Sequence, residues 1–146
     1  MDIFGVAYMS QATRIMSSED MDSLLVDVRA NNASIGITGV LLYGDGRFFQ
    51  YFEGAEADVA GVYARIRDSR RHHQIVELEY RQIPQRLFRK WFMGFRDAPA
   101  SVLQKLSQQQ WSRERPWMED HSTESPGMHE LLKFLDNSVE GDPVVE

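Results

Sequence analysis

Three polar side chains occupy positions that belong to apolar patterns of this sequence, so each of them needs a hydrogen-bond partner when buried. Gln50 lies within the aromatic run FFQYFEG at residues 48–54, and strand periodicity places it on the same face as Phe48. Its amide has two donors and one acceptor oxygen, and burying it unpaired costs about 1–3 kcal/mol. Tyr8, in IFGVAYM, and Asn32, at the end of a helical apolar stripe, are placed similarly. Such residues either form a self-satisfied hydrogen-bond network, or they surround a planar polar ligand with tyrosine as its redox partner.

The residue types that common enzyme and metal sites require are absent or scattered. The chain has no cysteine, which excludes disulfides, thiolate ligands and a cysteine nucleophile. Its histidines form neither an i, i+4 pair nor an HExxH motif, and no phosphate-binding glycine motif is present. Glu53 is a single carboxylate at a strand end, where the pattern favours a surface group or a cap over a lone catalytic acid.

Hydrophobic periodicity predicts the elements that position these residues. Residues 3–9 read as a strand, and a helix follows whose start carries Ser17 and Asp20 as a capping box. The inward stripe of this helix consists of Met21, Leu24, Leu25, Val28 and Asn32. Two strands then flank Gly44-Asp45-Gly46, a strong hairpin signal because glycine accepts a positive φ. A second helix, ending near Ser69, has the stripe Val59, Val62, Tyr63 and Ile66.

Two further strands are expected before the sequence changes character. The alternation in residues 74–83 predicts a half-buried strand, with Val76, Leu78 and Tyr80 on one face and Glu77, Glu79 and Arg81 on the other. The run KWFMGF predicts a short final strand with Trp91, Met93 and Phe95 on one face. From Ala98 onward we expect two helices, around residues 101–115 and 128–139, the second with a stripe of Met128, Leu131, Leu132, Leu135 and Val139.

The order β-α-β-β-α-β-β indicates a ferredoxin-like α+β sandwich, with a five-stranded mixed sheet, two helices on one face and two added C-terminal helices. In such a sheet the first and third strands are the adjacent central pair. Tyr8 and Gln50 are therefore expected to be neighbours beneath the first two helices.

Composition fits one globular domain, with 146 residues, 42% hydrophobic and 26% charged. The net charge of −6 argues against a nucleic-acid partner. A basic cluster at Arg65, Arg67, Arg70 and Arg71 fits a solvated helix end better than a phosphate contact. No membrane-length apolar run and no secretory signal are evident, so we expect a cytoplasmic protein without a membrane partner.

The same residues carry a resemblance to a known family. AYMSQA, NNASIGITGVLLY, GRFFQYFEG and RRHHQIVEL occur in order over about residues 2–97, and together they resemble the BLUF family of blue-light sensors that use FAD. The family fold is the βαββαββ arrangement expected above. The resemblance implies a photosensory protein whose output is a changed hydrogen-bond pattern.

The resemblance also implies a role for each matching residue. Tyr8 would donate an electron and a proton to the excited flavin, and Gln50 would bridge Tyr8 and the flavin edge, then rotate or tautomerise. Asn32 would bind the pyrimidine end of the ring, and Ser10 would lie near this network. Trp91 and Met93 would relay the signal, one of them lying near Gln50. The ring would be lined by Ile37, Phe48, Ile66, Arg71 and His72.

We therefore expect residues 1–97 to form a photosensory domain that binds FAD non-covalently. Residues 98–140 would form a helical extension that caps the sheet, mediates self-association or contacts a separate effector protein, and residues 141–146 a disordered tail. We expect no attached catalytic domain, and we expect the protein to form a homo-oligomer. The main alternative is a cofactor-free ferredoxin-like interaction module, and a small flavin-dependent enzyme is the other.

Overall fold

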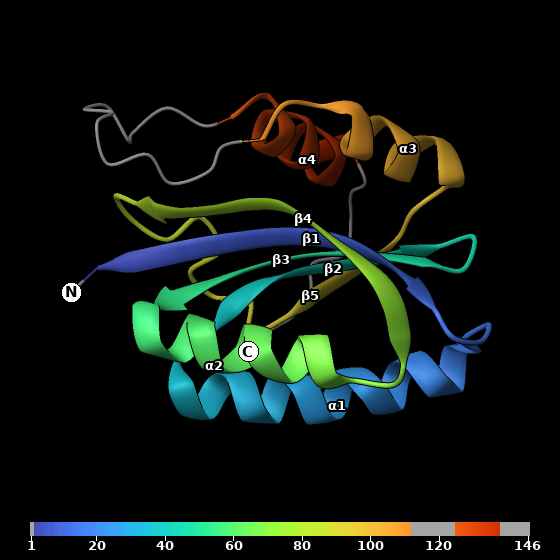
Figure 1. Ribbon diagram of the computed structural model, residues 1–146, viewed down its shortest axis with the longest axis horizontal. Helices are drawn as coiled ribbons and strands as arrows, with labels where there is room; N and C mark the ends of the chain where they lie inside the picture. The colour runs from blue at the N-terminus through green and yellow to red at the C-terminus, as the bar shows by residue number, and fades with distance from the viewer. Residues whose placement is uncertain (1, 112–124, 138–146) are drawn as a thin grey trace.

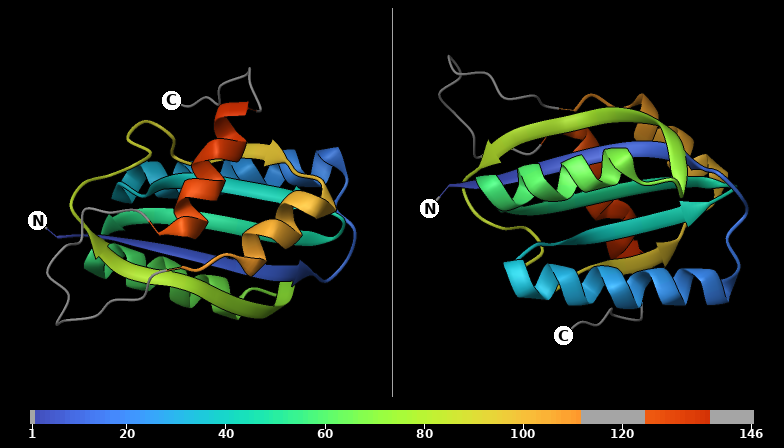
Figure 2. Two further views of the ribbon diagram at one scale, coloured as in Figure 1. Left: turned by 90° about the horizontal axis from the view of Figure 1, so that it is seen from above. Right: turned by 60° about the horizontal axis from the view of Figure 1, so that its bottom comes forward.

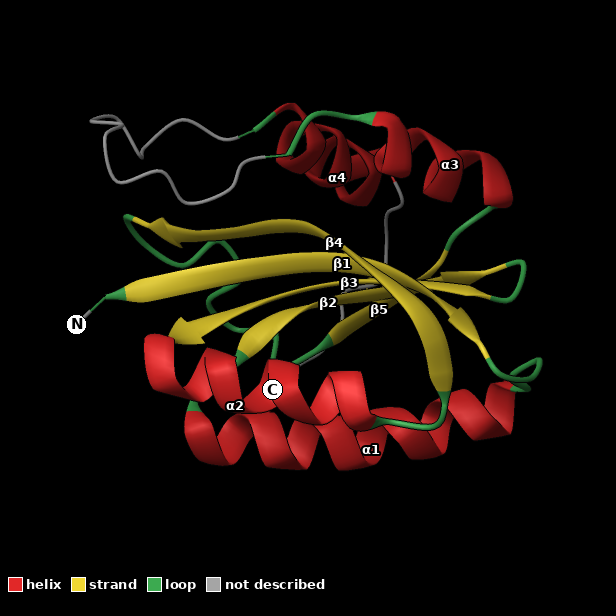
Figure 3. Cartoon of the chain, viewed as in Figure 1, coloured by secondary structure: helices red, strands yellow, loops and turns green. Residues whose placement is uncertain are grey.

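A computed structural model of the chain describes residues 2–111 and 125–137. The elements along the chain are β1 (Ile3–Ala12), α1 (Ser18–Ile35), β2 (Thr38–Gly44), β3 (Arg47–Ala55), α2 (Glu56–Asp68), β4 (His72–Ile83), β5 (Gly94–Asp97), α3 (Ala100–Gln108) and α4 (Pro126–Asn137). They form three layers, with the sheet between α1 and α2 on one face and α3 and α4 on the other (Figures 1 and 3).

The sheet has five strands in the order β4-β1-β3-β2-β5. β2 and β5 run parallel, whereas the other neighbouring pairs are antiparallel. This mixed sheet with two helices on its inner face is the ferredoxin-like α+β sandwich that the sequence predicts. β1 and β3 are adjacent, also as expected.

Local sequence signals explain where the inner-face elements begin and end. The Ser17 hydroxyl accepts a hydrogen bond from the Asp20 amide, and the Asp20 carboxylate accepts one from the Ser17 amide, so the predicted capping box is confirmed. The β2–β3 hairpin turns at Asp45 and Gly46, with φ values of 51° and 73°. Two consecutive residues with positive φ fit the twist of the flanking strands, which confirms the predicted tight hairpin.

Each face of the sheet has its own apolar cluster. The inner cluster, beneath α1 and α2, includes Val6, Leu25, Ile37, Phe52 and Val59. The outer cluster joins Ala7, Val40, Leu42 and Phe49 to residues of α3 and α4, namely Leu103, Leu106, Met128, Leu131 and Leu135. The C-terminal helices therefore cover the outer face of the sheet (Figure 2). The predicted position of Val139 and the expected tail lie outside the described residues.

The prediction of a regular alternation in β4 is wrong. Opposite β1, Ala7 pairs with Glu79 but Tyr8 pairs with Glu77, so the register shifts and Leu78 is an extra residue. A bulge of this kind reverses which residues face each side. Glu77 accepts a hydrogen bond from Tyr63 on the inner side, whereas Glu79 accepts one from Ser125 beside α4.

The predicted final strand is also shorter than expected. β5 begins at Gly94, so Trp91 and Met93 belong to the segment that connects β4 with β5. They do not share a face, because Met93 is part of the inner cluster and Trp91 packs against the outer cluster. Hydrogen bonds of this segment to the rest of the fold, described below, replace the expected strand pairing.

Candidate functional site

Tyr8 and Gln50 form the centre of the candidate site. They are direct partners in the β1–β3 register, and the Tyr8 hydroxyl donates to Gln50 Oε1 over 2.5 Å. The Gln50 Nε2 group donates to the Met93 sulfur at 3.5 Å. Both side chains are nearly buried, so the predicted contact between residues 42 apart in sequence is confirmed.

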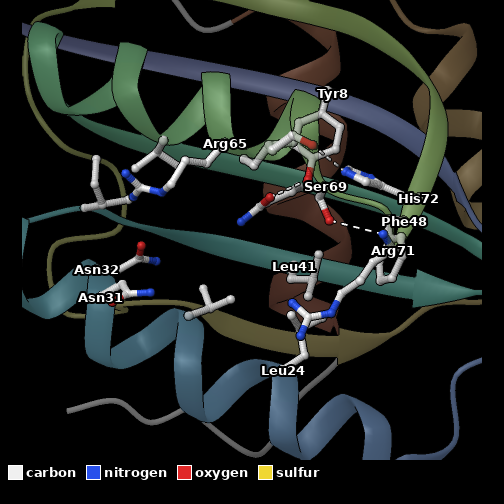
Figure 4. A pocket seen from close by; sticks show the side chains of 15 residues that line it. Tyr8, Leu24, Asn31, Asn32, Leu41, Phe48, Arg65, Ser69, Arg71 and His72 are labelled. Atoms are coloured by element: carbon white, nitrogen blue, oxygen red, sulfur yellow. Dashed lines mark hydrogen bonds between the residues drawn. The ribbon is translucent and has the colours of Figure 1, made fainter.

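These two residues face a cavity of about 220 Å³ between α1 and α2. Figure 4 shows Asn31 and Asn32 toward one end of the cavity and Arg71 and His72 toward the other. Its apolar lining consists of Leu24, Val28, Ile37, Leu41, Phe48, Val62 and Ile66. The polar lining adds Arg65 and Ser69 to the residues named above. Apolar walls with a few convergent polar groups are typical of a small-molecule site.

Burial keeps the Tyr8 hydroxyl protonated. Removal from water raises the pKa of Tyr8 above its ordinary value, and the neighbouring Tyr63 adds to this effect. Tyr8 is therefore a neutral hydrogen-bond donor across the physiological pH range. Its ring also lies 5.9 Å from the ring of His72 and 6.2 Å from that of Tyr63, measured between centroids.

Asn32 connects the cavity to the segment before β5. It is buried in the last turns of α1, and its Nδ2 group donates to the Phe92 carbonyl over 2.6 Å. Arg29, on the same helix, donates from Nε to the Met93 carbonyl over 2.8 Å. The helix that lines the cavity therefore also holds the backbone next to Met93.

Ser10 lies behind the cavity lining, where it contacts His72. Its hydroxyl is 2.6 Å from His72 Nδ1, and His72 Nε2 is 2.9 Å from the Ile66 carbonyl. Because a carbonyl only accepts, we assign the proton to Nε2, and the Ser10 hydroxyl then donates to Nδ1. Of the predicted site residues, Ile37, Phe48, Ile66, Arg71 and His72 line the cavity directly, and Ser10 orients His72.

Sequence reasoning did not assign Asn31, Arg65 or Ser69 to the site, although all three line the cavity. Asn31 directly precedes Asn32 in α1, and Arg65 and Ser69 lie in and just after the last turn of α2. Their closeness along the chain to the predicted residues Asn32 and Ile66 was the available signal. What the sequence does not indicate is that both helices turn these residues toward one space.

Glu53 differs from its expected surface position. Its side chain is fully buried, and it accepts hydrogen bonds from the backbone amides of Leu87 and Phe88. The expectation of a capping role is correct, but the capped groups belong to a loop that lies 34 and 35 residues later in the chain. Burial raises the pKa of Glu53, and the hydrogen bonds that it accepts oppose this effect.

The cavity fits a flavin in the chemistry of its groups. Aliphatic side chains from the two helices and the sheet provide apolar walls, while the amides of Gln50 and Asn32 offer both donors and acceptors to the edge of a heterocycle. Among the residues that the structure describes, no cluster of three or more histidine, aspartate or glutamate side chains is arranged to hold a metal ion. Within residues 2–111 and 125–137, no helix is both long and apolar enough to span a membrane.

The fold and the site together define a class of protein, a ferredoxin-like domain with a planar-ligand cavity over a Tyr–Gln pair. The family described as sensors of blue light using FAD, BLUF, matches residues 3–94. The chain belongs to this family of flavin-binding photosensory domains.

Relatives of the chain are light-regulated signalling proteins. The subunit beta of photoactivated adenylate cyclase from Euglena longa is 36% identical over 83 residues, which are 57% of this chain and 10% of that protein. A subunit alpha from Euglena gracilis is 37% identical over 83 residues, which are 8% of its length. The matched part of the chain thus spans about a tenth or less of the length of these relatives.

Solved structures agree with the fold. The dark-state structure of BlrB, a BLUF protein, is 26% identical with a TM-score of 0.62, and the match covers 73% of this chain and 79% of that one. A bacterial light-regulated adenylyl cyclase is 30% identical with a TM-score of 0.66, over 73% of this chain and 34% of that one. The photo-activated state of BlsA is 22% identical with a TM-score of 0.69, and the match covers 97% of this chain and 99% of that one. At this identity the similarity supports the fold alone.

Proposed function

We propose that this protein is a blue-light photoreceptor that binds one FAD non-covalently between α1 and α2 and signals to a separate effector protein. The observation that carries the proposal is the buried hydrogen bond from Tyr8 to Gln50 at the wall of an apolar cavity. Tyr8 can donate an electron and a proton, and the Gln50 amide beside it can change its hydrogen bonds. The donor and the switch are therefore in direct contact. The sensor family of the chain supports this reading.

The walls of the cavity would hold the ring system through Ile37, Phe48 and Ile66. Asn32 would bind its polar edge, and Arg71 and His72 would line the ring from the end of α2 and the start of β4. When bound, a flavin absorbs blue light and in its excited state becomes a strong one-electron oxidant. FAD and FMN carry the same ring system, so the ring site does not distinguish them, and the family description favours FAD.

The residues of this chain provide the response. Tyr8 would give up an electron to the excited flavin, and its hydroxyl proton would move along the existing hydrogen bond to Gln50 Oε1. Both would return to Tyr8 in the reverse transfer. Gln50 then rotates or tautomerises. Rotation turns Oε1 toward Met93, whose thioether sulfur is an acceptor and has no proton to donate. In the rotated state the Gln50–Met93 contact would therefore be broken, and the segment before β5 would lose one of its attachments.

The output would pass through this segment and the C-terminal helices to a partner. The relatives named as adenylate cyclases support a signalling role, and we infer that this chain passes its signal to an effector protein. We further propose that residues 1–97 form the photosensory unit, that residues 98–140 form its output extension and that the chain self-associates. A bistable packing of the segment next to Met93 is the element that light would bias.

The experiment that tests the proposal is optical. The purified protein, reconstituted with FAD, is expected to show flavin absorbance and a small reversible red shift after blue light. Denaturation should release the flavin unmodified, which measures non-covalent binding. A protein that takes up no flavin would favour the cofactor-free interaction module, and flavin reduction in the dark that depends on an added substrate would favour an enzyme.

A further inference from the structure

Glu53 is the most completely buried carboxylate of the sheet, and the photochemistry described above does not use it. It lies on β3 three residues after Gln50, so the two side chains point to opposite faces. Each of its oxygens has two donors. Oε1 accepts from the Tyr51 hydroxyl at 3.0 Å and the Leu87 amide at 2.9 Å. Oε2 accepts from the Thr38 hydroxyl at 3.1 Å and the Phe88 amide at 2.6 Å.

The segment that Glu53 holds is the one that carries Met93. Between the end of β4 at Ile83 and the start of β5 at Gly94 the chain has neither helix nor strand, so hydrogen bonds to other elements fix its position. Three carbonyls hold its second half in place. The Trp91 carbonyl accepts from the Gly39 amide, the Phe92 carbonyl from Asn32, and the Met93 carbonyl from Arg29. Its first half is held by Glu53 and by Arg86, which donates to Thr38.

We infer that Glu53 is a positioning residue that fixes the start of segment 84–93 and thereby places Met93 against Gln50. This inference rests on the proposed photosensory function, since it concerns the same Gln50 contact. β3 holds the segment at two points, by Gln50 on the inner face and by Glu53 on the outer face. When rotation of Gln50 breaks its hydrogen bond to Met93, the Glu53 attachment remains together with those of Gly39, Asn32 and Arg29, and it helps to return the segment to its dark position.

A carboxylate is needed for this task because the two backbone amides bind different oxygens. Glutamine has the same shape but only one acceptor oxygen, so Glu53→Gln must set its NH₂ group against either the Leu87 or the Phe88 amide. The matched control is Glu79→Gln. Glu79 is also a buried carboxylate on the outer face, and it accepts a hydrogen bond from the Ser125 hydroxyl beside α4.

The first measurement does not depend on flavin. Hydrogen–deuterium exchange at the Leu87 and Phe88 amides is compared in the flavin-free wild type, Glu53→Gln and Glu79→Gln. We expect protection in the wild type and in Glu79→Gln, and exchange about tenfold faster or more at one of these amides in Glu53→Gln. Protection that is unchanged in Glu53→Gln overturns the inference.

The second measurement is dark recovery of the red shift in the flavin-loaded proteins. Glu53→Gln should retain the shift and recover about two- to tenfold more slowly, which is the effect of losing one hydrogen bond. In a Met93→Ala background the same substitution should have no further effect, because Glu53 acts through Met93. Equal recovery of Glu53→Gln and wild type, or fully additive effects with Met93→Ala, would overturn the inference.

Failure of the wild type to show any red shift would count against the photosensory function and leave the exchange result as the test of the Glu53 attachment. If Glu53→Gln does not fold, the wild type alone decides. Its Leu87 and Phe88 amides should stay protected in darkness and under illumination. Rapid exchange of both amides in the dark would then refute the positioning role.

Discussion

Replacing Tyr8 with phenylalanine tests the proposed switch with the smallest possible change. The substitution removes the hydroxyl that donates to Gln50 Oε1 and leaves the ring, with its contacts to Tyr63 and His72, in place. We expect the protein to fold and bind flavin and to show no reversible red shift after blue light. The physical reason is that phenylalanine has no hydroxyl proton to transfer to Gln50.

The cost in stability follows from the burial of Gln50. Its Oε1 atom loses its donor, and an unsatisfied buried acceptor costs about 1–3 kcal/mol. Gln50 borders the cavity, where a water molecule or a ligand replaces part of the lost bond. The free energy of unfolding should therefore fall by about 1 kcal/mol, near the lower end of that range. Urea denaturation of the flavin-free protein, followed by circular dichroism, measures it.

Tyr63→Phe is the matched control. Tyr63 is buried beside Tyr8 and donates to Glu77 instead of Gln50. This variant removes a hydroxyl from the same cluster, so it should lose a similar amount of stability and retain the red shift. Absorbance spectra before and after illumination compare the two variants. A normal shift in Tyr8→Phe, or loss of the shift in both variants, would refute the role of the Tyr8–Gln50 hydrogen bond.

Three further predictions concern Gln50, the buried tyrosines and α4. Gln50→Leu should bind flavin and fail to shift normally, since the Tyr8 hydroxyl loses its acceptor; an unchanged difference spectrum would contradict this. Burial raises the pKa of Tyr8 and Tyr51, so their contribution to stability is complete below pH 10 and is lost as pH rises further. In urea titrations above pH 10, Tyr8→Phe should therefore show a shallower fall in the free energy of unfolding than the wild type. Ser125→Ala removes the hydroxyl that caps the Met128 amide and donates to Glu79, and it should lower the free energy of unfolding by about 1–2 kcal/mol without changing the red shift.

The pattern of apolar residues was sufficient for the order of the elements and for the central pair, but not for the facing of β4 or the start of β5. Periods of two and of 3.6 residues are local properties of strands and helices, so the inward positions of Tyr8, Gln50 and Asn32 could be read from their immediate neighbours. Element order then gave the ferredoxin-like sheet, in which β1 and β3 are adjacent. The hairpin at Asp45 and the capping box at Ser17 were predictable for the same reason, because each depends on a few consecutive residues.

Features that depend on partners far along the chain could not be predicted from local patterns. The bulge at Leu78 turns Glu77 and Glu79 to opposite faces of the sheet, and it arises from a shift in the register between β4 and β1. The position of Glu53 predicted a surface group or a cap without indicating which groups it would cap, because its donors at Leu87 and Phe88 come from a segment without periodicity.

The sequence by itself therefore determined the sensor fold and the polar pair that faces its cavity. Tertiary structure alone decided that Met93 lies against Gln50 while Trp91 packs on the other side of the sheet. Irregular segments have no periodic pattern that indicates which face of the sheet a side chain takes. Individual long-range hydrogen bonds set their position instead. In this protein those bonds converge on β3, with Gln50 on one face and Glu53 on the other.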